Sequence, residues 1–189
     1  MLYADKAVLK STIKQRSTQL REKELALFTE NFAAIGTQAA LLAGFSLTSL
    51  AEFNVPPDGN RFCKSAFYVL VITTFASALH CVCNTTFVSV WGPGLALRGP
   101  EGSMAVAIES MIDERRHVFT SFGIAVMSFL MAAISMAWLV MDFEVALVAT
   151  FILMYAIHLI TNYSRRIYKR FEVDDSLSTK FDDLLSIID

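Results

Sequence analysis

One stretch of the chain places side chains suited to cation chemistry on a single helical stripe. The stripe consists of Leu41, Phe45, Thr48 and Glu52, which follow one another at intervals of four, three and four residues. Glu52 ends a long uncharged run, and a carboxylate in an apolar span usually faces water or a bundle interior because contact with lipid is costly. We therefore expect Glu52 to face an aqueous axis.

A ring of identical subunits would gather one Glu52 from each copy around that axis. Neighbouring carboxylates about 7 Å apart repel by roughly 2 kcal/mol per pair at an effective dielectric of about 20, so the ring must take up protons or cations. Flexible oxygen ligands suit Ca²⁺, and acidic rings are a recurrent filter of cation channels. Glu52 is thus the predicted metal ligand and selectivity filter, with Thr48 as a polar step and with Phe45 and Leu41 as a gate that closes by dewetting. The alternative is an interfacial acid among lipid headgroups.

The composition indicates the kind of protein that must position this stripe. Hydrophobic residues make up 54% of the 189-residue chain, charged residues make up 18%, and the mean hydropathy is positive. Four apolar windows are each about as long as the ~20 residues that a spanning helix needs, namely 32–53, 66–91, 118–141 and 145–163. We expect an all-α membrane protein with four transmembrane helices per subunit, the first lining a central pore. A polar segment of mixed charge precedes the first window, which is unlike a signal peptide.

The basic residues predict the orientation of the spans. Of the 16 Lys and Arg residues, Arg61 and Lys64 alone fall in the two loops that would face outward, so both termini should be cytosolic. The predicted organisation is a cytosolic helical extension over 1–31, a four-span domain over 32–163 and a cytosolic acidic amphipathic helix over 164–189.

The predicted breaks between the helices follow from turn-forming residues. Residues 5–35 contain no Gly or Pro, so a cytosolic helix should continue directly into the first span. The outer loop is expected at 54–59, and Trp-Gly-Pro-Gly at 91–94 should end the second span. A short cytosolic helix is predicted over 104–117, and a tight outer turn over 141–144.

Two further patterns predict contacts between helices. Gly36, Ala40 and Gly44 are four residues apart, a spacing that lets helices approach closely in lipid. At the other end of the chain, an apolar stripe recurs at helical spacing among acidic residues, formed by Leu177, Phe181, Leu184 and Ile188. This acidic helix could pack against its own copies or serve as the docking site of a regulator that carries a basic helix, and the two roles are compatible.

His80 and His158 each have two interpretations. A buried imidazole in a membrane most often hydrogen-bonds to Ser or Thr, and Ser121 or Ser135 are possible partners across helices. Partners nearer in sequence are Thr73, Ser77 and Thr161. The alternative for His80 is gating support, as a proton-sensitive link between the pore helix and its surroundings.

Other classes of protein are disfavoured. The net charge of -2 gives no reason to expect nucleic acid as a partner, and no catalytic triad, phosphate-binding glycine loop or zinc spacing occurs. Cys81 and Cys83 lie inside an apolar window, where small buried Cys is common, so a membrane thiol enzyme is disfavoured. We expect neither an enzyme nor a cofactor apart from the permeant Ca²⁺; the main alternative is a non-channel tetraspan scaffold that recruits partners through its acidic C-terminal helix.

The chain resembles a known family at four places in the same order. The stretch ALLAGFSLTSLAEF at 40–53 is similar to the first transmembrane segment of the Orai channels, the pore subunits of store-operated, calcium-release-activated calcium entry. Further similarities are ALH at 78–80, ERRH at 114–117 and AIHL at 156–159. The resemblance implies a homohexamer in the plasma membrane with Glu52 as its filter. It also implies pore-lining positions for the three residues below Glu52, a hinge-like position at Gly44, and engagement of the C-terminal helix by the endoplasmic-reticulum calcium sensor, the stromal interaction molecule.

The chain also departs from this family inside the expected pore. Thr48 stands where the family has a valine in its gate, which should weaken dewetting there and leave more of the closure to Phe45. Thr37 and Ala33 stand at pore-lining positions that are basic in the family, so cations should meet less repulsion in the inner pore. In the third span, Ile134 stands at a position where the family has an acidic residue.

Overall fold

The computed structural model describes residues 2–53, 60–99 and 102–171, which form four long helices and no strand. The helices are α1 (Leu2–Glu52), α2 (Arg61–Arg98), α3 (Ser103–Val140) and α4 (Phe143–Phe171). Each is long and apolar enough to cross a membrane. The expected all-helical architecture with four candidate spans is therefore confirmed.

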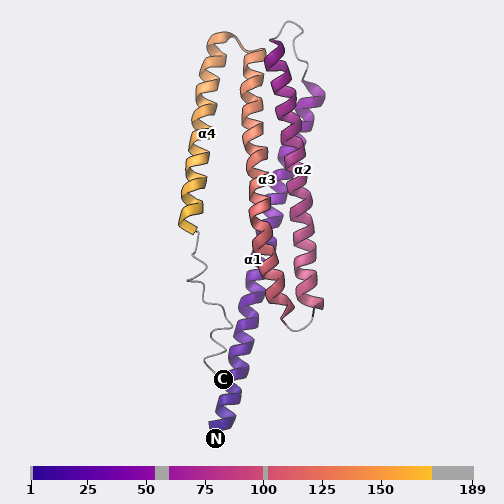
Figure 1. The fold of residues 1–189 in the computed structure, drawn as a ribbon, viewed down its shortest axis with the longest axis vertical. Helices are drawn as coiled ribbons and strands as arrows, with labels where there is room; N and C mark the ends of the chain where they lie inside the picture. Colours follow the sequence, from indigo (N-terminus) through magenta and orange to yellow (C-terminus); the bar gives the residue numbers. More distant parts are fainter. Residues whose placement is uncertain (1, 54–59, 100–101, 172–189) are drawn as a thin grey trace.

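The helices follow one another through space in chain order. The helix α2 packs against both α1 and α3, and α3 also contacts α1, while α4 packs against the far side of α3 and forms one edge of the bundle (Figure 1). The N-terminal half of α1 extends well beyond the other helices (Figure 1). The predicted continuous helix from the polar segment into the first span is confirmed, because α1 runs from Leu2 to Glu52 without a break.

Two predicted breaks are wrong. The second span does not end at 91–94, because α2 continues through Pro93 to Arg98 and ends where the Gly99 N–H bonds to the Leu95 carbonyl. Proline lacks an N–H, but long apolar helices tolerate it when packing supports the chain on both sides. The short helix over 104–117 is not separate either, because it is the beginning of α3.

The remaining connections agree with their turn chemistry. Asn60 caps α2, its side chain accepting a hydrogen bond from the Phe62 N–H at 3.1 Å. Gly102 precedes α3 with φ of 93°, a conformation that glycine adopts without strain. The predicted tight turn before the fourth span is confirmed, since α3 ends at Val140 and α4 begins at Phe143. The predicted loop at 54–59 lies outside the described residues.

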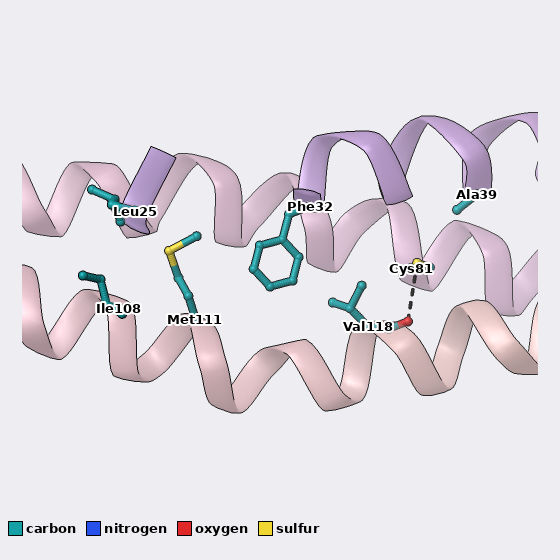
Figure 2. Close-up of a cluster of buried hydrophobic side chains, with 7 residues drawn as sticks. All are labelled: Leu25, Phe32, Ala39, Cys81, Ile108, Met111 and Val118. Atoms are coloured by element: carbon teal, nitrogen blue, oxygen red, sulfur yellow. Dashed lines mark hydrogen bonds between the residues drawn. The ribbon is translucent and has the colours of Figure 1, made fainter. Parts of the chain in front are cut away.

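The core runs along the seam where α1, α2 and α3 meet. Residues seven apart on α1 are buried there, namely Leu25, Phe32, Ala39 and Ser46. The first three pack with Cys81 of α2 and with Ile108, Met111 and Val118 of α3 (Figure 2). A spacing of seven keeps one face of a helix turned toward its neighbours, so the opposite face of α1 is left outside this core.

Nearer the N-terminal end of α2, a second apolar cluster and a buried polar contact join α2 to α3. The cluster contains Phe67 and Val71 of α2 and Ala132 and Leu139 of α3. A hydrogen bond of 2.9 Å joins the hydroxyls of Thr74 and Ser128, both of which are buried. Each hydroxyl also lies 2.8 Å from a carbonyl oxygen one turn earlier in its own helix, Leu70 for Thr74 and Ile124 for Ser128, so both buried groups are satisfied.

Candidate functional site

The predicted stripe lies on the face of α1 that points away from the core. Leu41 and Phe45 are each 58% exposed, and Thr48 and Glu52 are exposed as well. Thr37 and Gly44 are exposed on the same side of the helix. The structure therefore brings all six residues onto one open face, opposite the seam that packs against α2 and α3.

The hydroxyl groups of the two threonines on this face donate hydrogen bonds to carbonyl groups within α1. The Thr48 hydroxyl donates to the Gly44 carbonyl at 3.0 Å, and the Thr37 hydroxyl donates to the Ala33 carbonyl at 2.9 Å. Each oxygen keeps lone pairs that can accept a hydrogen bond or approach a cation. Thr48 therefore presents an electron-rich oxygen one helical turn below Glu52.

Glu52 is the last residue of α1, where the helix itself carries partial negative charge. The final carbonyl groups of a helix lack intrahelical donors, and the helix dipole places about half a negative charge at this end. Glu52 is exposed and makes no hydrogen bond or ion pair with the other described residues. Its carboxylate and the helix terminus together create a site that attracts cations.

The described residues of one chain do not complete a metal site around Glu52. Within the described ranges, no group of three or more His, Cys, Asp or Glu side chains is close enough to hold an ion. Further copies of the chain could supply additional carboxylates to a cation held at Glu52.

The small residues of α1 do not form one packing surface within the chain. Gly36 faces α2, and a Cβ atom placed there would lie 2.6 Å from the Thr85 Oγ1. A Cβ atom on Gly44 would meet no atom within 4 Å, and Ala40 is exposed. Gly36 thus permits the close approach of α1 and α2, whereas Gly44 belongs to the open face.

His80 lies between two polar side chains. Its Nδ1 is 3.0 Å from the Ser121 Oγ across the interface with α3, as one of the sequence interpretations predicted. Its Nε2 is 3.4 Å from the Asn84 side-chain nitrogen, one turn farther along α2. On α4, the His158 Nε2 is 2.8 Å from the side-chain nitrogen of Asn162.

Asn84 and Asn162 were missed from sequence, although each lies four residues after its histidine and so on the same helical face. The contacts around His80 agree with the structural interpretation; its support of gating stays a prediction.

The open face of α1 extends farther toward the N-terminus than the predicted stripe. From Phe45 toward the N-terminus, exposed residues recur at alternating intervals of four and three residues, namely Leu41, Gln38, Ala34, Asn31, Leu27, Glu24 and Leu20. The two amides were not singled out from sequence, although this spacing could have identified them. The predicted docking stripe of Leu177, Phe181, Leu184 and Ile188 lies outside the described residues.

In comparisons with known proteins, no family model, curated protein or solved structure matches the chain.

Proposed function

We propose that the chain is the subunit of an Orai-like, calcium-selective channel in which α1 of each copy lines a common axis. The observation that carries the proposal is the open face of α1. This face holds a carboxylate and hydroxyl groups, yet it lies in a helix long and apolar enough to span a membrane, and no other described helix covers it. Polar groups in that position are stable beside water or other copies of the chain and costly beside lipid.

A ring of α1 helices would order the chemistry along the axis. Glu52 from each copy would form the outermost ring and bind Ca²⁺, aided by the negative ends of the helices. The Thr48 oxygens would follow as neutral acceptors, and Phe45 and Leu41 would form the apolar constriction. Farther inward, Thr37 would line the path with an uncharged polar group, which offers little repulsion to a cation.

The proposal is tested with full-length protein in liposomes that contain a calcium-sensitive dye. Replacing one carboxylate per subunit removes the charge that holds the divalent ion, so we expect Glu52→Gln to lower Ca²⁺ influx more than about tenfold. Glu144→Gln is the matched control, because Glu144 is an exposed acid at the outer end of α4 and should retain influx.

A closed channel is distinguished from a protein that is not a channel by widening the constriction. Phe45→Ala should increase influx, and Glu52→Gln added to it should remove that gain. If neither the parent nor Phe45→Ala conducts, the channel proposal fails and the scaffold alternative is favoured. Equal loss in the Glu52 and Glu144 variants would also contradict a filter at Glu52.

A further inference from the structure

A groove lies between the middle of α1 and the N-terminal half of α3. The two helices enclose a groove of about 320 Å³. Its walls include apolar, amide and cationic side chains, namely Phe28, Ile35, Phe119, Asn31, Gln38 and Arg115. The groove is therefore apolar along most of its length but carries one positive charge and two amide groups.

Arg115 supplies a cation that the rest of the described chain does not neutralise. Its side chain is exposed and makes no hydrogen bond or ion pair with another described residue. Phe119, one turn farther along α3, is 53% exposed in the same groove. A guanidinium beside an open apolar wall is suited to an amphiphile with an anionic head.

The depth of these residues matches the layers of a bilayer leaflet. The third apolar stretch starts at Val118. Arg115 lies three residues before it, or about 4.5 Å along the helix. The headgroup layer of each leaflet is about 5–8 Å thick, so Arg115 lies at the level of lipid phosphates. Phe119 and Ile35 lie at the level where acyl chains begin. On α1, the lining from Phe28 to Gln38 extends about 15 Å, enough to reach from one layer into the other.

We propose that this groove binds an anionic phospholipid of the cytosolic leaflet. Arg115 donates to the phosphate, the amide of Asn31 donates to phosphate or ester oxygens, and the acyl chain lies against Phe119 and Ile35. A lipid with net negative charge fits better than a zwitterionic one, because a choline group would bring a second cation near Arg115. This site does not depend on ion conduction through the first helix.

The experiment places a fluorescent reporter in the groove of the full chain. Phe119→Trp and the parent are reconstituted in nanodiscs of phosphatidylcholine and titrated with brominated phosphatidylglycerol or brominated phosphatidylcholine. The difference between variant and parent isolates the signal at position 119 from Trp91 and Trp138. We expect half-maximal quenching at about fivefold lower mole fraction of the anionic lipid, the factor for one basic residue near the membrane surface.

The matched control uses the neighbouring arginine. Arg116 is exposed and does not line the groove, so Arg116→Gln should preserve the preference for phosphatidylglycerol, whereas Arg115→Gln should abolish it. Equal quenching by the two lipids, or equal loss in both arginine variants, would overturn the site. Absence of quenching by either lipid would show that a second copy covers the groove. A preference that emerges only after residues 172–189 are deleted would show that this acidic segment occupies it, and both results would refute the proposal.

Discussion

The two glycines of α1 that differ most in surroundings give a test at the scale of single residues. At Gly36 a new methyl group would clash with the Thr85 hydroxyl, whereas at Gly44 it would meet open space. We expect Gly36→Ala to lower the free energy of unfolding by about 1–3 kcal/mol, the usual cost of overpacking, and Gly44→Ala to leave it unchanged or slightly higher. Thermal unfolding in detergent measures both.

The same clash predicts a rescue. Thr85→Ala removes the oxygen that the new methyl group would contact, so the double variant with Gly36→Ala should regain part of the lost stability. Equal destabilisation by the two glycine variants would mean that α1 and α2 do not approach each other closely at Gly36.

Among the helices, α4 is the one most weakly held, and its attachment is concentrated at its N-terminal end. The Trp138 indole donates to the Thr150 hydroxyl at 3.0 Å and contacts the Phe143 ring edge-on at 5.8 Å between centroids. The described positions from Asn162 to Arg170 are all exposed. The short turn thus anchors the start of α4 while its C-terminal end lies apart from α3.

This arrangement predicts that one indole controls the position of α4. Trp138→Phe keeps the aromatic ring but loses the hydrogen bond, which should cost about 0.6 kcal/mol, the average for such bonds between membrane helices. Spin labels on α3 and α4 should then report a broader distance distribution. Trp91→Phe is the control, since Trp91 is 69% exposed on α2 and should leave that distribution unchanged.

The sequence predicted the helices better than it predicted their ends. Apolar windows identified all four helices, and the absence of Gly and Pro identified the long first helix. Pro93 led to the wrong end for α2, because the tendency of proline to break a helix is a local property. The packing of α2 against two neighbouring helices is a tertiary effect that overrides this tendency. The stripe at Leu41–Glu52 followed from periodicity, but the groove at Arg115 did not, because it joins residues more than 75 positions apart.

At the scale of the whole molecule, exposure alone does not distinguish a surface that faces lipid from one that faces other copies. Thr48 on α1 and Phe151 on α4 are both exposed, yet a ring with α1 at its axis would bring together the Thr48 positions and separate the Phe151 positions. In a background without native cysteines, we therefore expect Thr48→Cys to form disulfide-linked dimers on oxidation and Phe151→Cys to remain monomeric. Denaturing gel electrophoresis measures both, and the reverse pattern would place α4 at the axis.

The unbroken length of α1 also has a mechanical consequence. With 51 residues at 1.5 Å each, the helix is a rod about 75 Å long, and neither Gly nor Pro interrupts its N-terminal half. A torque applied near Lys23 is therefore not absorbed by a flexible joint before Gly36. Beyond Gly36 the helix stays unbroken through Gly44 to its last residue, so the carboxylate at the far tip turns with the rod unless one of these two glycines bends.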